Sequence, residues 1–282
     1  MTSTTVPASR ATALPHAAPR LAALVTLTGR RLALTLRNPR AILLPLATPV
    51  LIAVVIAPTL ARAAGPISGL DYMTYVAIGT AALVVPLSCM QAGLGVIVDR
   101  KSGAQPDLLT APIPRPLIVL ANLAAALAAS GLQLAALLAF SALRGADFHV
   151  TAAGFGWFAA AAIGLAVATY GIAETLANRI GEEEEYVNMI PTIGIAPWFF
   201  AGSLFPIGYL PGWLAAIAKL LPVTHAVALM RYGLAGSAAG LHAIWGLTDV
   251  TQMAALSLLV LTLYAAGLTW LAIRVFTRTA LR

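Results

Sequence analysis

Six long stretches of the chain carry no Asp, Glu, Lys or Arg, and this pattern sets the expected architecture. The stretches are 41–61, 72–98, 116–143, 148–173, 186–218 and 250–273. Each is long enough for a helix to cross a bilayer, because about 30 Å of hydrocarbon needs roughly 20 residues. Backbone amides in a bilayer must bond within the protein, and the runs are continuous rather than alternating, so helices are predicted and a barrel is not.

The expected fold is therefore all-α and integral to the membrane, with six transmembrane helices in one domain over residues 21–282. The expected spans are about 41–61, 74–98, 116–142, 151–176, 186–204 and 250–273. Residues 1–20 are rich in Ser, Thr, Ala and Pro, which predicts a disordered cytoplasmic tail. Residues 21–37 mix Leu with Arg, a pattern typical of an amphipathic helix that lies in the membrane interface.

The fifth stretch, 186–218, is longer than one crossing requires, and its second half contains Pro206, Gly208, Pro211 and Gly212. Irregular backbone at membrane depth is stable only where protein or a water-filled cavity covers it. We therefore predict a re-entrant helix pair over 205–222, with its second short helix from Pro211 to about residue 221. The alternative is one long, kinked helix. In the re-entrant interpretation Lys219 and Arg231 both stay outside the membrane.

Composition supports a membrane protein, since 60% of residues are hydrophobic and 10% are charged, against about a quarter charged in soluble domains. The net charge of +7 does not indicate nucleic-acid binding, because the basic residues flank apolar runs instead of sharing a polar module with aromatic residues. Lys and Arg concentrate in the N-terminal flank, the loop after the second span and the C-terminus, which predicts cytoplasmic termini. The expected location is the plasma membrane.

Candidate chemistry is sparse. A phosphate-binding P-loop needs a Lys that follows a Gly, and neither Lys101 nor Lys219 does, so no ATP site is expected in this chain. No Ser-His-Asp or paired-carboxylate arrangement indicates catalysis, and the histidines are too scattered for a metal site. The single cysteine, Cys89, lies in an apolar run and is expected to be a small buried hydrophobe.

Three segments resemble the permeases of ABC-2-type transporters, and the resemblance extends over residues 21–282. They are "LRNPRAILLPLATPVL" at 36–51, "DRKSGAQPDLLTAPIPRP" at 99–116 and "FAGSLFPIGYLPGWLAAIAKLLPVTHAVALMRYGLAG" at 200–236. The last carries Phe205–Pro206, then Pro222 and Arg231 in the family's order. Within the family the chain is similar to drug permeases of the daunorubicin-resistance type. One departure is Pro106, which predicts a shorter or later coupling helix.

The resemblance implies a membrane subunit of an ABC exporter that has no cofactor of its own. ATP and Mg²⁺ would belong to two partner ATPase subunits, and a second permease subunit, identical or homologous, would complete the complex in membrane lipid. The segment 99–113 would form a coupling helix that docks on the ATPase, with a plain connecting loop as the alternative. The candidate coupling residues are Arg100, Lys101, Gly103, Asp107, Leu108, Leu109 and Arg115, of which the two leucines are expected to enter a groove.

Two further residue sets follow from this interpretation. The candidate outer-gate residues are Phe205, Pro206, Tyr209, Pro211 and Trp213. The candidate substrate-path residues are Met90, Gln91, Glu174, Asn188, Phe199 and Phe200. Glu174 lies near the end of the fourth span, where it either contacts substrate or partner or reaches interfacial water. The glutamates at 182–185 either favour the start of the fifth span through the helix dipole or contact a partner.

An apolar path favours a hydrophobic or amphipathic small molecule as the exported substrate. The alternative within the same class is a polysaccharide or glycolipid exporter, whose path would be expected to carry more aromatic rings. A different class, an ATPase-independent transporter or an intramembrane enzyme, would place ionisable groups near the middle of the bilayer. The predicted spans carry none there, which argues against that class.

Overall fold

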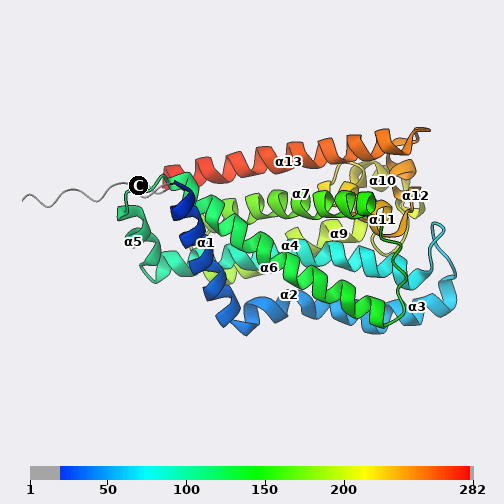
Figure 1. The fold of residues 1–282 in the computed structure, drawn as a ribbon, viewed down its shortest axis with the longest axis horizontal. Coiled ribbons are helices and arrows are strands. Elements are labelled where there is room, and N and C mark those ends of the chain that lie inside the picture. Colours follow the sequence, from blue (N-terminus) through cyan, green and yellow to red (C-terminus); the bar gives the residue numbers. More distant parts are fainter. Residues whose placement is uncertain (1–19, 280–282) are drawn as a thin grey trace, which may run out of the picture.

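The computed structural model describes residues 20–279 as a bundle of long helices that run side by side between two ends (Figure 1). We call these the α5 end, where α1 (Arg20–Arg37) and α5 (Ala104–Thr110) lie, and the α12 end, where α10 (Gly212–Ala218) and α12 (Ala239–Trp245) lie. Within these residues the structure is helical with no β-strand. The expected tail lies outside the described residues, apart from Arg20, which begins α1.

Five helices in the described range are long and apolar enough to cross a membrane. They are the run Pro39–Arg62, α4 (Tyr72–Lys101), α6 (Arg115–Leu143), α7 (Ala152–Ala177) and α13 (Val250–Thr279). The first run comprises α2 (Pro39–Leu51), the π-helical η1 (Ile52–Ile56) and most of α3 (Ala57–Ala64). The all-α membrane fold expected from the charge-free stretches is confirmed.

The central element is α4, which has 72% of its span window buried, whereas α13 at the edge of the bundle has 22%. Between its ends α4 carries no charge from Tyr72 to Val98 and is apolar all round, as expected of a helix enclosed by others. It packs against α2, α6 and α7. A large cluster of buried side chains from α4, α6, α7, α11 (Pro222–Ala235) and α13 forms the core.

The fifth predicted span corresponds to a broken helix. It consists of α8 (Glu183–Ile190), the π-helical η2 (Pro191–Ile195) and α9 (Ala196–Phe200). The helix therefore begins before residue 186 and ends before residue 204. Its end is set by a turn at Gly202, whose φ of 79° favours glycine. Like η1, the η2 segment packs on α4, so both π-helical interruptions lie against the central helix.

The predicted re-entrant pair over 205–222 matches the helices of this segment only in part. After the short η3 (Ile207–Tyr209), α10 and α11 form a pair bent by 79°. The predicted second short helix, from Pro211 to about residue 221, corresponds to α10, and α11 starts at Pro222, where the expected pair ended. In the structure Arg231 is buried within α11.

Close backbone contact joins α4 to the turn after α9. A Cβ on Gly79 would lie 2.3 Å from the Ser203 carbonyl oxygen, and Trp198 Nε1 donates to the Gly79 carbonyl at 2.6 Å. We expect Gly79→Ala to lower the free energy of unfolding by about 1–3 kcal/mol, because backbone atoms must move to admit the methyl group. Thermal unfolding in detergent measures this. Gly156→Ala in α7, where no atom lies within 4 Å, is the control; an equal loss in both variants would contradict the expectation.

Candidate functional site at the α5 end

The connection between α4 and α6 is a short helix flanked by two sharp turns. Gly103 has a φ of 82° and lets the chain turn from α4 into α5. The predicted coupling helix 99–113 is therefore divided: residues 99–101 form the last turn of α4, and α5 covers only Ala104–Thr110. Arg115 begins α6 beyond the second turn. The shorter helix agrees with the expectation drawn from Pro106.

The two leucines that were expected to dock on a partner contact other residues of this chain instead. Leu108 and Leu109 are half-buried and pack against the chain's own core. The exposed side of α5 is formed instead by Pro106, Asp107 and Thr110. If α5 meets a partner, these three residues make the accessible face, and the leucines hold α5 to the bundle.

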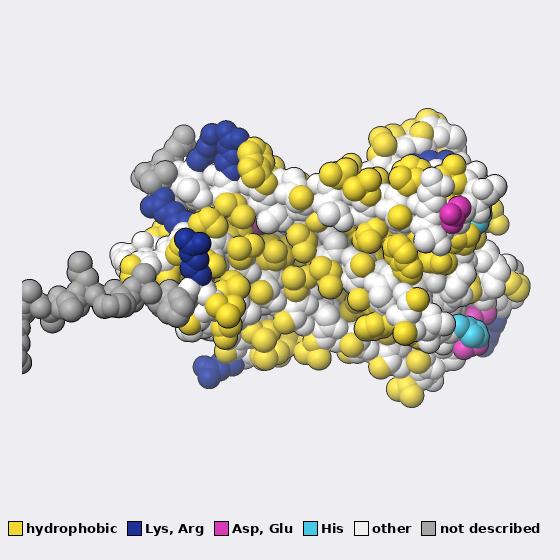
Figure 2. Space-filling view, turned by 45° about the horizontal axis from the view of Figure 1, so that its top comes forward, with side chains coloured by type: hydrophobic (Ala, Val, Ile, Leu, Met, Phe, Trp, Pro, Cys, Tyr) yellow, Lys and Arg dark blue, Asp and Glu magenta, His cyan; other side chains and the backbone are white. Residues whose placement is uncertain are grey.

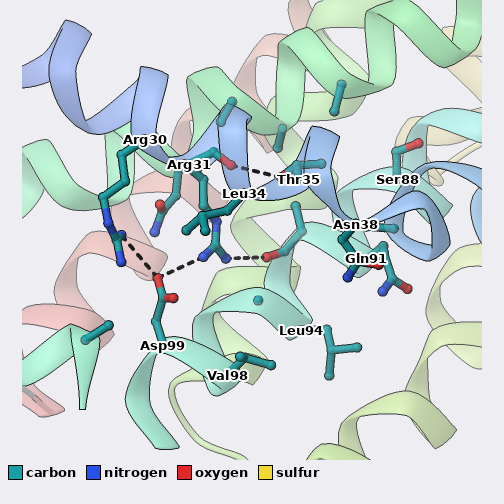
Figure 3. Close-up of a pocket in the computed structure, with 18 of the residues that line it drawn as sticks. Arg30, Arg31, Leu34, Thr35, Asn38, Ser88, Gln91, Leu94, Val98 and Asp99 are labelled. Carbon is teal, nitrogen blue, oxygen red and sulfur yellow. Dashed lines mark hydrogen bonds and ion pairs between the residues drawn. The ribbon is translucent and has the colours of Figure 1, made fainter. Parts of the chain in front are cut away.

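Three consecutive residues at the end of α4 each bind a different part of the chain. We call Asp99, Arg100 and Lys101 the α4 junction. Asp99 Oδ2 accepts a hydrogen bond from Arg31 Nη1 of α1 at 2.8 Å (Figure 3). Arg100 donates to the carbonyls of Ala177 and Ile180, and Lys101 Nζ lies 2.7 Å from Glu182 Oε2. The junction therefore links α1, the end of α7 and the start of α8 to the base of α5.

These links differ in strength. The Arg31 and Asp99 side chains are 8% and 15% exposed, so water screens their charges little. Arg100 donates hydrogen bonds to carbonyls that the end of α7 leaves without helical partners. The Lys101–Glu182 pair is exposed and contributes little to stability, although the hydrogen bond and charge of Lys101 lower the pKa of Glu182.

The glutamate run is thereby divided between two roles. Glu182 contacts Lys101 of its own chain. Glu183, Glu184 and Glu185 occupy the first turn of α8, where the helix dipole stabilises negative charge.

The α12 end is held together by Arg231. Its guanidinium donates to the carbonyls of Gly202 at 2.7 Å, Ser203 at 2.8 Å and Tyr75 at 3.2 Å. It also lies 3.5 Å above the ring of Tyr75. These contacts join α11, the turn after α9 and the start of α4. We call this group of residues the Arg231 clasp.

Of the candidate outer-gate residues, Pro206 lines a small cavity of about 30 Å³ beside this clasp. Phe205 and Pro206 are half-buried. Tyr209, Pro211 and Trp213 are exposed. Exposed Tyr and Trp side chains at one end of a helical bundle are typical of the membrane–water interface.

The candidate substrate-path residues separate into three environments. Met90 and Glu174 are fully buried, and Asn188, Phe199 and Phe200 are exposed along α8 and α9. Glu174 accepts hydrogen bonds from Tyr170 Oη at 2.5 Å and from Asn178 Nδ2 at 3.0 Å. The expectation that Glu174 reaches interfacial water is therefore wrong, because partners on its own helix satisfy it away from solvent. Gln91 lines a cavity.

That cavity lies at the α5 end and has a volume of about 410 Å³. It is enclosed by α1, α2, α4 and α6 (Figure 3). Its lining includes Arg30, Arg31 and Asp99, none of which was among the candidate site residues. The adjacent arginines in an otherwise apolar helix, together with Asp99 directly after a charge-free stretch, were the available signal. Within residues 20–279 no group of His, Cys, Asp and Glu side chains could hold a metal ion.

The sequence model of the family described as "ABC-2 type transporter" matches residues 22–235, which extend from α1 to the end of α11. The chain belongs to this family. The α4 junction, α5 and the Arg231 clasp all lie inside the matched segment. This ABC-2 protein is thus a multi-pass membrane protein and a transmembrane component of an ABC transporter, of a family that normally works with ABC ATPase subunits. None of the curated proteins compared with it matches its sequence.

Proposed function

We propose that this ABC-2 protein is the permease subunit of an ATP-driven exporter whose α5 end faces the cytoplasm. The orientation is supported by the Lys and Arg side chains that gather at the α5 end, whereas the middle of the bundle surface is largely hydrophobic (Figure 2). The basic residues at that end include Arg37, Arg40, Arg115, Arg274 and Arg278. Basic residues favour the cytoplasmic side of membrane proteins. The membrane would be the plasma membrane.

The α4 junction is the observation that carries this proposal. A displacement of α5 would move the end of α4 through Gly103. It would then be passed to α1 through the Arg31 contact, to α7 through Arg100 and to α8 through Lys101. Two partner ATPase subunits, which would bind ATP and Mg²⁺, would cause that displacement of α5. Because α4, α7 and the α8–α9 segment continue towards the α12 end, a small shift at α5 would be distributed across the bundle.

The transported substrate is proposed to be a hydrophobic or amphipathic small molecule, such as a drug, an antibiotic or a lipid-like compound. The exposed side of α8 and α9 supports this, because it presents Val187, Met189, Phe199 and Phe200 with Asn188 among them. A second permease subunit packed on this side would complete a largely apolar path. No described feature favours the polysaccharide or glycolipid alternative.

Reversing the charge of Asp107 tests the coupling face. Asp107 is exposed on α5, so Asp107→Arg should leave folding intact while it weakens binding of the partner ATPase by about tenfold or more. Co-purification from cells that express both subunits, with ATP turnover of the purified complex, measures this. Asp147→Arg, at an exposed site near the α12 end, is the matched control. Unchanged assembly of Asp107→Arg would refute α5 as the docking element.

A second measurement addresses the class of function. The purified chain reconstituted alone in vesicles should move no substrate and hydrolyse no ATP. Transport by the lone chain would refute the proposal and favour an ATPase-independent transporter.

A further inference from the structure

The cavity at the α5 end is a closed-ended channel along α4. Its lining runs from Ser102 at the mouth to Ser88 at the inner end, a distance of about 20 Å on a helix that rises 1.5 Å per residue. Gln133 closes the inner end, because it bonds to Ser88 and donates to the Ile42 carbonyl at 2.7 Å. Its volume of about 410 Å³ lies in the range of ligand sites.

The lining changes in character from mouth to interior. Small apolar residues form the middle, namely Ala92, Ala125, Ala126 and Ala129. The rim carries two half-exposed apolar side chains, Leu34 of α1 and Val98 of α4, each 45% exposed. A purely polar ligand would leave these apolar side chains exposed to water. An extended apolar chain would cover them.

The charge at the mouth is positive, because two arginines share one carboxylate. Arg31 donates hydrogen bonds to Asp99 at 2.8 Å and to the Ala92 carbonyl at 3.1 Å. Arg30 lies 3.7 Å from the same carboxylate oxygen and is 38% exposed, and it makes no other polar side-chain contact with the described residues. Its guanidinium is therefore available to an anion that approaches the mouth (Figure 3).

Two amides complete the polar part of the lining. The Gln91 and Asn122 side chains face the cavity and bond to no residue in the part of the chain that the structure describes. Asn122 lies on the mouth side of the alanines, where its amide suits ester or hydroxyl oxygens between a charged group and an apolar chain, and Gln91 lies one helical turn from Ser88 near the inner end.

We propose that this cavity binds an anionic phospholipid from the leaflet at the α5 end. The phosphate would lie beside Arg30, the glycerol esters near Asn122, and one acyl chain along α4 between the alanines. Because α1 forms one wall, a bound lipid packs between α1 and the α4–α6 pair, beside the Arg31–Asp99 contact. This site goes beyond the proposed export function and requires no ATPase.

Photo-crosslinking in nanodiscs tests the site. The full chain is reconstituted in phosphatidylcholine with a small fraction of phosphatidylglycerol that carries a diazirine in its acyl chain, and adducts are mapped by peptide mass spectrometry. We expect adducts on the parts of α4 and α6 that line the cavity. Excess phosphatidylglycerol should remove them, and neither phosphatidylcholine nor glycerol phosphate should do so.

Matched variants separate this site from general lipid contact. Ala129→Leu fills the cavity and should abolish these adducts, whereas Ala128→Leu on the neighbouring exposed position should not. Arg30→Gln should reduce labelling about fivefold, the equivalent of about 1 kcal/mol for one basic residue. Arg37→Gln, exposed on the same helix and outside the cavity, should leave labelling unchanged.

Several outcomes would overturn the proposal. Equal labelling of Ala129→Leu and wild type would place the lipid elsewhere, and Ala92→Leu, which fills the cavity from α4, repeats this test if Ala129→Leu fails to fold. Competition by phosphatidylcholine would refute selectivity for an anionic lipid. Displacement by glycerol phosphate would show that the site takes a free phosphate instead.

Discussion

Arg231→Met will loosen the α12 end and lower the free energy of unfolding by about 3–5 kcal/mol. The substitution removes the Arg231 hydrogen bonds to three buried carbonyls, those of Gly202, Ser203 and Tyr75, of which Gly202 keeps the Tyr75 hydroxyl as a donor. Each buried acceptor without a partner costs about 1–3 kcal/mol, offset in part because the charged guanidinium no longer has to be desolvated. Thermal unfolding in detergent and proteolysis of the 201–222 segment measure the effect.

Two control variants make the Arg231 result specific. Arg231→Lys keeps the charge but supplies fewer donors in a different geometry, and should give an intermediate loss. Arg144→Met removes an exposed arginine near the same end and should change stability by less than about 0.5 kcal/mol. Wild-type stability of Arg231→Met would mean that the clasp does not hold the turn after α9.

The second large effect is expected at the Arg31–Asp99 pair. Arg31→Gln and Asp99→Asn should each lower the free energy of unfolding by about 2–4 kcal/mol, because each breaks the 2.8 Å pair between two poorly hydrated charges. The double variant should be less damaging than the sum of the two, since it buries no unpaired charge. In the assembled transporter both single variants should also reduce the transport achieved per ATP hydrolysed.

The nearby Arg30 provides the matched control for this pair. Arg30 is 3.7 Å from the same carboxylate and more exposed, so Arg30→Gln should cost less than about 1 kcal/mol. Strictly additive effects of Arg31→Gln and Asp99→Asn would contradict a direct coupling between the two side chains. Double-mutant analysis of thermal and denaturant unfolding provides the measurement.

The general plan was predictable because hydrocarbon imposes a simple rule on the chain. Long stretches without charge identified α4, α6, α7 and α13 to within a few residues. The family resemblance likewise followed from local features, such as Phe205–Pro206 and the spacing from Pro222 to Arg231. Local composition also predicted the amphipathic α1, because its alternation of Leu and Arg needs no distant partner.

The functional surfaces were harder to predict, because the identity of a charged residue does not show which residue it will contact. Arg100 and Lys101 suggested contacts with an ATPase, yet both are bonded to the α7–α8 region of the same chain. Leu108 and Leu109 suggested a docking surface, yet they hold α5 to the core. In each case the competing partner lies far away in sequence, so local pattern could not identify it.

The sequence by itself determined that this protein is a helical membrane bundle, since charge-free length is a local property. The tertiary structure alone decided which charges are buried and which face is left free. Arg31 and Arg231 tolerate burial only because Asp99 and a set of backbone carbonyls converge on them from other helices. That convergence depends on how the helices pack, and packing joins residues that the linear order keeps apart.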